Sequence, residues 1–116
     1  MIEQKATSRF YLRDKHHAVD PSGTEVELPN RDDLIYRTKG EELILRIDFD
    51  FVGDVCFTTH VFLPKKLYWI SGRPLTKSEI VTLQIDIRDA LVAFDSLVLF
   101  KGHEWVEKCL NQLGED

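Results

Sequence analysis

The hydrophobic pattern of this chain changes once along its length, and that order constrains the fold more than any other feature. Over residues 1–70, short segments rich in β-branched and aromatic side chains alternate with turn residues, a pattern typical of strands. From Thr76 onward, a helix-start signal is followed by an apolar stripe with helical spacing. Strands first and helices afterwards predict an α+β domain, in which an antiparallel sheet is covered on one face.

The N-terminal part predicts a meander of short strands. The candidate strands span residues 7–12, 24–28, 34–38, 42–51, 55–63 and 67–70. Asp20-Pro21-Ser22-Gly23 is a strong turn signal between two of them, because proline presets φ and glycine accepts a positive φ. The sequence therefore predicts one antiparallel sheet of five to seven strands.

Residues 42–51 show the clearest alternation. One side carries Leu43, Leu45, Ile47, Phe49 and Phe51, and the other carries Glu42, Ile44, Arg46, Asp48 and Asp50. This period of two is typical of a half-buried strand whose apolar side faces the core. The residues that follow predict a hairpin with Gly53 and Asp54 as a two-residue loop, which suits a type II′ turn.

Thr76 and Glu79 have the spacing of a capping box, in which each side chain accepts from a backbone N–H of the other residue. The apolar stripe that follows comprises Ile80, Leu83, Ile87, Ala90, Leu91 and Phe94, and the opposite side carries Lys77, Thr82, Asp86, Arg88 and Asp89. We expect one long helix over 76–94, packed on the apolar side of the 42–51 strand. Residues 97–100 then predict a further short, buried strand, and residues 103–113 predict a C-terminal helix.

The size and composition predict a single α+β domain, residues 1–116, around one core. No apolar stretch approaches the length of a membrane span, and residues 1–5 lack the basic start and apolar run of a signal peptide. We therefore expect a cytoplasmic protein that does not bind membranes. In that compartment, Cys56 and Cys109 are expected to be reduced thiols rather than a disulfide.

The formal net charge of −5 disfavours sequence-independent binding to nucleic acid, which depends mainly on lysine and arginine contacts to phosphate. The same charge is compatible with a basic protein partner, because complementary fields speed encounter. The sequence leaves open whether the chain forms a homodimer.

The chain contains no catalytic, metal-binding or nucleotide-binding motif, and the sequence predicts no cofactor. The predicted central hairpin carries the most reactive residues, and its register decides which of them meet. With a two-residue loop, Asp48 and Asp50 lie on the polar side. Cys56, Thr58 and His60 then lie on the apolar side. That separation disfavours a Cys–His or Asp–His catalytic pair, unless the register shifts by one residue.

Two functions remain compatible with these features. The first is a non-enzymatic protein-binding module that neutralises or recruits a basic partner. Its predicted contact residues are Glu42, Arg46, Asp48 and Asp50 on the polar side of one strand, with Trp69 and Arg73 in addition. Small toxin-neutralising immunity proteins share this general size and charge, which is an analogy of bulk properties and not of any motif. The alternative is a small-ligand-binding protein or an enzyme that uses a pocket between sheet and helix, lined by Cys56, Thr58 and His60.

Overall fold

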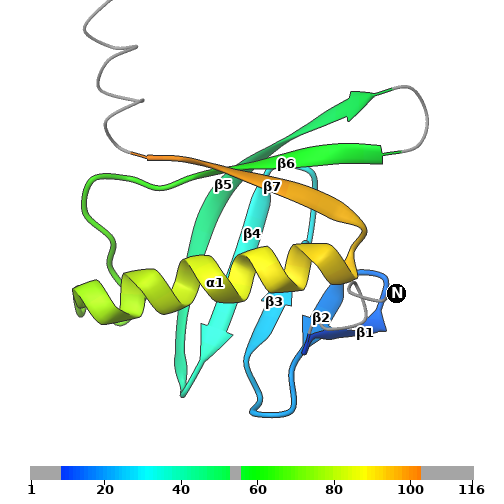
Figure 1. Ribbon diagram of the computed structural model, residues 1–116. Helices are drawn as coiled ribbons and strands as arrows, with labels where there is room; N and C mark the ends of the chain where they lie inside the picture. The colour runs from blue at the N-terminus through cyan, green and yellow to red at the C-terminus, as the bar shows by residue number, and fades with distance from the viewer. Residues whose placement is uncertain (1–8, 53–55, 103–116) are drawn as a thin grey trace, which may run out of the picture.

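A computed structural model describes residues 9–52 and 56–102, which form one curled sheet and one α-helix (Figure 1). The elements are β1 (Tyr11–Asp14), β2 (His17–Val19), β3 (Glu25–Glu27), β4 (Asp33–Thr38), β5 (Glu41–Val52), β6 (Cys56–Phe62), α1 (Lys77–Ala93) and β7 (Ser96–Lys101). The seven strands stand in the sheet in sequence order, and each pair from β1 to β6 is antiparallel. The predicted α+β class with a largely antiparallel sheet is confirmed.

Strand β5 alternates between buried and exposed side chains as its sequence predicts. Leu43, Leu45 and Ile47 are at most 4% exposed. Between them, Ile44 is 53% exposed and Arg46 also faces solvent. The strand therefore has one side in the core and one side in water, and we call the corresponding faces of the sheet the inner face and the outer face.

Helix α1 begins at the predicted capping box. The Thr76 hydroxyl accepts from the backbone N–H of Glu79 at 3.1 Å, and the Glu79 carboxylate accepts from the backbone N–H of Thr76 at 2.9 Å. The helix ends with Phe94 as its C-cap, and Asp95 adopts a positive φ of 61° directly after it. Both ends agree with the prediction of a helix over 76–94.

Helix α1 crosses in front of β3, β4 and β5 on the inner face of the sheet (Figure 1). Its buried side chains include Leu83, Ile87 and Leu91, each 0% exposed. They belong to one continuous core with buried residues of β2 to β6, among them Val26 and Leu45. One helix therefore supplies much of the apolar cover that this sheet needs.

Strand β7 differs from the prediction of a buried strand. It pairs with β6 in parallel and forms the edge of the sheet. Leu97 and Leu99 are 64% and 50% exposed. The parallel orientation follows from the connection, since the chain crosses from β6 to β7 through a helix. A short apolar run does not reveal whether its strand is central or at an edge.

The predicted strand at 67–70 is a loop in the structure. Only a single bridge joins Tyr68 to Pro74 among the described residues. The loop closes through backbone hydrogen bonds from Trp69 N to the Arg73 carbonyl and from Gly72 N to the Trp69 carbonyl, with Gly72 at a positive φ of 100°. The predicted C-terminal helix, 103–113, lies outside the described residues. No helix among the described residues combines the length and the apolar character needed to cross a membrane.

Candidate functional site

The pairing of β5 with β6 differs by one residue from the pairing predicted from the sequence. Asp48 lies opposite His60, and Asp50 lies opposite Thr58. Three residues, 53–55, separate the two strands instead of the predicted two. Because side chains alternate along a strand, a shift of one position reverses the face of every β6 side chain. The predicted register was therefore wrong, and Asp48 shares a face with His60.

The shift gathers acidic and apolar side chains on the outer face. Across β5, β6 and β7, one row of neighbours is Asp48, His60 and Leu99, and the next row is Asp50, Thr58 and Leu97. We call these six residues the β5–β7 patch. Thr58 and His60 thus lie beside the aspartates on the outer face, whereas the prediction placed them on the helix side. The Cys56 side chain, which completed that predicted pocket, lies outside the described part of the structure.

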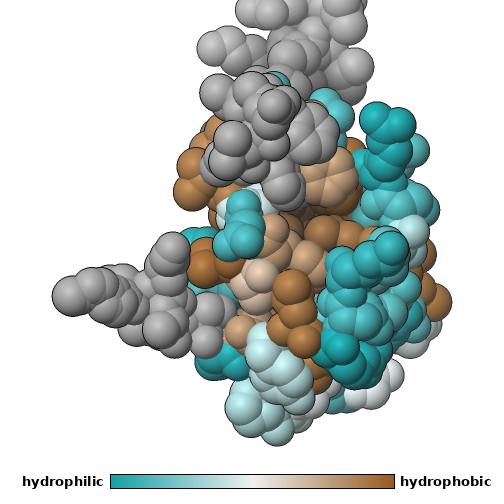
Figure 2. All heavy atoms as spheres, turned by 90° about the vertical axis from the view of Figure 1, so that its right-hand side faces the viewer, coloured by the Kyte–Doolittle hydropathy of each residue, from teal (hydrophilic) through white to brown (hydrophobic). Residues whose placement is uncertain are grey.

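The apolar end of the patch borders a groove of about 450 Å³ along the edge strand. The groove is lined by Thr58, Leu97 and Leu99 of the sheet and by Arg88 and Val92 of α1. Figure 2 shows hydrophobic atoms gathered around a hollow on the side of the molecule where α1 ends and β7 begins. Exposed leucines beside a groove are a feature of surfaces that bind another molecule.

His60 and Asp50 form a loose ion pair within the patch. His60 Nε2 lies 3.6 Å from Asp50 Oδ2, and the Asp50 side chain is 70% exposed. A histidine beside a carboxylate is an arrangement also used in general-base chemistry. Here the Asp50 side chain is largely exposed, so the pair lies on the surface rather than in an enclosed site.

Four of the six residues predicted to contact a partner lie along the outer face of β5: Glu42, Arg46, Asp48 and Asp50. Two of these already have a neighbour of opposite charge. Glu42 accepts from Arg37 Nε at 3.2 Å, and Arg46 Nε lies 3.8 Å from Asp33. The acidic residues of β5 thus become less neutralised toward the hairpin end, where Asp48 and Asp50 lie.

The other two predicted contact residues lie elsewhere. Trp69 is only 3% exposed and belongs to the core, so it is not part of an exposed surface. Arg73 stands over the Trp69 ring near the start of α1, where it bonds to Glu41 and Glu79. The exposed aromatic residue of this loop is Tyr68, at 52%.

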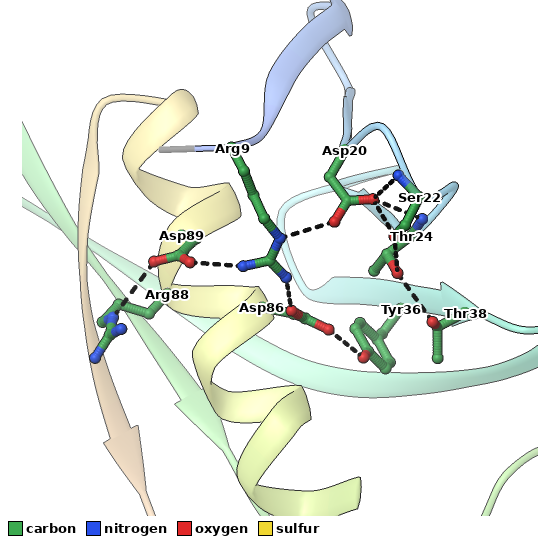
Figure 3. A network of polar contacts seen from close by, with 9 residues as sticks. All are labelled: Arg9, Asp20, Ser22, Thr24, Tyr36, Thr38, Asp86, Arg88 and Asp89. Atoms are coloured by element: carbon green, nitrogen blue, oxygen red, sulfur yellow. Dashed lines mark hydrogen bonds and ion pairs between the residues drawn. The ribbon is translucent and has the colours of Figure 1, made fainter. Parts of the chain in front are cut away.

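A second polar centre, which the sequence did not indicate, joins α1 to the N-terminal strands (Figure 3). Arg9 donates to Asp20 Oδ2 at 2.8 Å and to Asp89 Oδ2 at 2.9 Å, and it also contacts Asp86. Asp86 Oδ2 accepts from the Tyr36 hydroxyl at 2.6 Å. One guanidinium thus links three carboxylates, two of them on the helix.

Burial and hydrogen bonding act together on the pKa values of two groups in this centre, Tyr36 and Asp20. Burial raises the pKa of the Tyr36 hydroxyl to about 12, so it remains a donor. Burial opposes ionisation of Asp20, but hydrogen bonds from Ser22, Arg9 and Thr24 outweigh it and leave the pKa of Asp20 below its usual value. The groups are mutually satisfied, which is typical of a structural link between elements.

Asp86 was expected on the polar side of the helix and is instead 3% exposed. The signal for its burial is its position. It lies three residues after Leu83 and four before Ala90, so it falls on the apolar stripe. An acidic residue on such a stripe indicates a buried partner, but its spacing does not identify Arg9 and Tyr36.

A third cluster lies on the outer face of β2 and β3. Ligand atoms of His17, Glu25 and Glu27 lie within 4.8 Å of one another, close enough to hold a metal ion. Arg37 already contacts both carboxylates, at 3.2 Å from Glu25 and 2.9 Å from Glu27. The guanidinium supplies the positive charge that a metal would bring, so this cluster is an ion-pair network.

The β5–β7 patch is therefore the candidate functional site, since it combines exposed carboxylates with exposed leucines. In the other two polar centres, the carboxylates already contact an arginine of the protein itself. Comparisons with protein-family models, with curated proteins and with solved structures gave no match to this chain.

Proposed function

We propose that this protein is a non-enzymatic binding module that neutralises or recruits a basic protein partner through the β5–β7 patch. The observation that carries the proposal is the register of β5, β6 and β7, which is consistent with two carboxylates and two exposed leucines on one face of the sheet, with Thr58 and His60 between them. Within the described residues, the only helix lies on the inner face, so no described element covers the patch (Figure 1).

The charge of the patch favours a basic partner. Asp48 and Asp50 face solvent, and the neighbour that Asp50 contacts is His60, whose charge depends on protonation. The chain as a whole carries a formal net charge of −5. Fields of this sign attract basic surfaces and increase the rate of encounter, while repelling acidic ones.

The leucines supply the second requirement for a stable contact. Protein interfaces combine apolar and polar side chains, and Leu97 and Leu99 add exposed apolar side chains to the face that carries Asp48 and Asp50. The charges increase the rate of association, and burial of the leucines stabilises the complex. Each such side chain contributes about 1.5–3 kcal/mol when it is fully buried.

Site-specific photo-crosslinking in cells that naturally express the chain tests this proposal. A photoreactive phenylalanine analogue replaces Leu99 in one variant and Val81, which is 56% exposed on α1, in a control variant. We expect the Leu99 variant to capture one discrete basic protein and the Val81 variant not to capture it. Capture of the same protein from Val81 alone, or of no discrete protein from Leu99, would count against the patch.

A further inference from the structure

Within the described residues, the outermost strands of the sheet are β1 and β7, and their edges differ in protection. Strand β1 has only four residues, its register shifts between Leu12 and Asp14, and it carries the charges of Arg13 and Asp14. Short length, a bulge and charged side chains are features that keep an edge strand from pairing with another chain. Strand β7 has six residues in an unbroken register with β6, and its one charged residue, Lys101, stands at its end. The β7 edge is therefore the less protected of the two.

One hydrogen bond shows which backbone groups of β7 point toward this edge. The backbone N–H of Leu63 donates to the Lys101 carbonyl at 3.0 Å, so Lys101 directs its backbone groups toward β6. Along a strand these groups point to alternate sides, so every second residue of β7 does the same. The N–H and C=O groups of Val98 and Phe100 therefore point away from β6, to a side on which the described residues place no strand (Figure 1).

Apolar surface lies beside these backbone groups. The groove of about 450 Å³ is lined by Leu97, Val98 and Leu99 of β7 and by Val92 of α1, which is 37% exposed. A strand added at this edge would remove part of that surface from water, which stabilises association. The edge thus offers main-chain hydrogen bonds and apolar contacts to the same occupant.

The direction of the backbone groups restricts how a second copy of β7 can pair with the first. In an antiparallel pair, the residues that exchange hydrogen bonds lie directly opposite each other. Val98 and Phe100 must therefore face residues of the second copy whose groups also point outward. Two symmetric registers meet this condition with the longest overlap, one centred on Val98 and one centred on Leu99.

Side-chain chemistry distinguishes the two registers. With Val98 at the centre, Leu97 of each copy lies opposite Leu99 of the other, on the outer face. Lys101 then lies opposite Asp95, an exposed residue directly before β7. With Leu99 at the centre, Leu97 would lie opposite Lys101, and no charged pair would form. Apolar and opposite-charge pairs stabilise neighbouring strands, so the register centred on Val98 is favoured.

We propose that this protein forms a symmetric homodimer in which two β7 strands pair antiparallel, centred on Val98. The twofold axis makes each favourable contact twice, since a contact from one copy to the other is repeated in reverse. Leu97 meets Leu99 twice, and Lys101 meets Asp95 twice. The second copy is thus a partner whose charge and apolar pattern are complementary to this edge. The inference goes beyond the function proposed for the β5–β7 patch and does not depend on it.

Sedimentation velocity of the full chain tests the proposal through two charge reversals. The wild type should change from monomer to dimer over a concentration range of about two orders of magnitude, as mass action requires. Lys101→Glu brings two pairs of like charges together and should raise the dissociation constant about tenfold. Asp95→Lys should act similarly, and lysine is accepted at its positive φ of 61°, since Lys39 already has a φ of 50°.

An equimolar mixture of these two variants provides the decisive comparison. In the mixed dimer, each substituted residue meets the opposite charge, so the mixture should dimerise about as tightly as the wild type. Lys15→Glu, in the exposed turn between β1 and β2, is the control. It changes the net charge as Lys101→Glu does and should leave dimerisation nearly unchanged.

The register can be read from the wild type without any substitution. In an equal mixture of isotope-labelled and unlabelled chains, residues opposite each other in a non-hydrogen-bonded pair bring their α-protons close together. We expect an intermolecular NOE between the α-protons of Leu97 and Leu99. The register centred on Leu99 would instead join the α-protons of the two Leu99 residues.

The inference is overturned by a wild type that stays monomeric at every concentration, or by intermolecular NOEs that connect residues outside β7. It is also overturned if the two charge-reversed chains, each shown by its amide spectrum to be folded, do not dimerise when mixed. Equal weakening by Lys15→Glu would replace the specific pairing with an effect of net charge. A contact between the two Leu99 residues would contradict the register centred on Val98.

Discussion

Buried polar side chains of this protein are hydrogen-bonded to one another. Tyr36 is 1% exposed, and its hydroxyl has a charged acceptor, Asp86, at 2.6 Å. Asp86 in turn contacts Arg9. Each group compensates the burial of the next, so the loss of one member leaves another without its partner.

Tyr36→Phe should reduce the free energy of unfolding by about 1.5–3 kcal/mol, because it removes a hydrogen bond to a charged group. Urea unfolding at neutral pH measures the loss. Tyr68→Phe is the matched control, since Tyr68 is 52% exposed, and should change stability by about 0.5 kcal/mol or less. Equal effects of the two variants would show that the Tyr36 hydroxyl contributes little.

Tyr36→Phe is also expected to change how the free energy of unfolding depends on pH under alkaline conditions. The folded-state pKa of Tyr36 is raised from 10 to about 12, so its neutral form is favoured in the folded protein. Its contribution to stability is complete below pH 10 and is lost as the pH rises through 12. Tyr36→Phe should therefore lose less stability than the wild type between these two pH values, in urea titrations at each pH.

At the scale of single elements, α1 is defined at its start by residues that serve two purposes. Thr76 and Glu79 close the capping box, and Glu79 also receives two hydrogen bonds from Arg73 in the preceding loop. Arg73 bonds to Glu41 of β5 as well. The helix start is thus joined to the sheet through one guanidinium, and the loop that carries Arg73 also brings Trp69 into the core.

Protonation of Glu79 should weaken this connection. The Arg73 guanidinium, together with the Thr76 backbone N–H, lowers the pKa of Glu79 from 4.5 to about 2. A lowered folded-state pKa means that the contribution to stability is present above pH 4.5 and is lost as the pH falls toward 2. Carbon-detected NMR titration of the Glu79 carboxyl should give the low pKa, and Arg73→Gln should raise it.

A stability measurement gives the complementary test. Glu79→Gln keeps an acceptor for the Thr76 N–H but cannot ionise, so its unfolding free energy should vary less with pH between 2 and 4.5 than that of the wild type. An unchanged pH dependence would mean that other carboxylates account for the acid sensitivity.

For the molecule as a whole, one core holds helix and sheet together. Ile87 is 0% exposed within it, and Ile85, two residues earlier on the same helix, is 40% exposed. Ile87→Ala should therefore cost about 2–5 kcal/mol of unfolding free energy through lost burial and the cavity left behind. Ile85→Ala should cost far less. Denaturant unfolding of both variants compares them, and similar losses would show that the core has been assigned to the wrong side of α1.

The distribution of charge over the whole molecule governs the predicted association. Once a partner has been identified, Asp48→Asn with Asp50→Asn should slow association and weaken its dependence on salt, because exposed charges act mainly on encounter. Val81→Lys with Ile85→Lys changes the net charge equally but on the exposed side of α1. Stopped-flow association over a range of salt concentrations distinguishes them. Equal rates for the two double variants would indicate an effect of net charge alone.

Local features of the sequence were sufficient for much of the architecture. The alternation in residues 42–51 predicted which side of β5 is buried, and the Thr76–Glu79 spacing predicted where α1 begins. Both signals are local, since a strand's period and a helix cap depend on residues a few positions apart. The α+β class followed from the order of these elements.

Contacts between segments far apart in the sequence could be identified only from the tertiary structure. The register of β5 against β6 depends on the residues between them, and one more connecting residue moved Thr58 and His60 to the face of Asp48 and Asp50. The edge position of β7 and the buried partners of Asp86 likewise depend on residues far apart in the chain. The sequence by itself determined the α+β class, the bounds of α1 and the buried side of β5. Only the three-dimensional packing decided which side chains meet, because no local pattern encodes a long-range pairing.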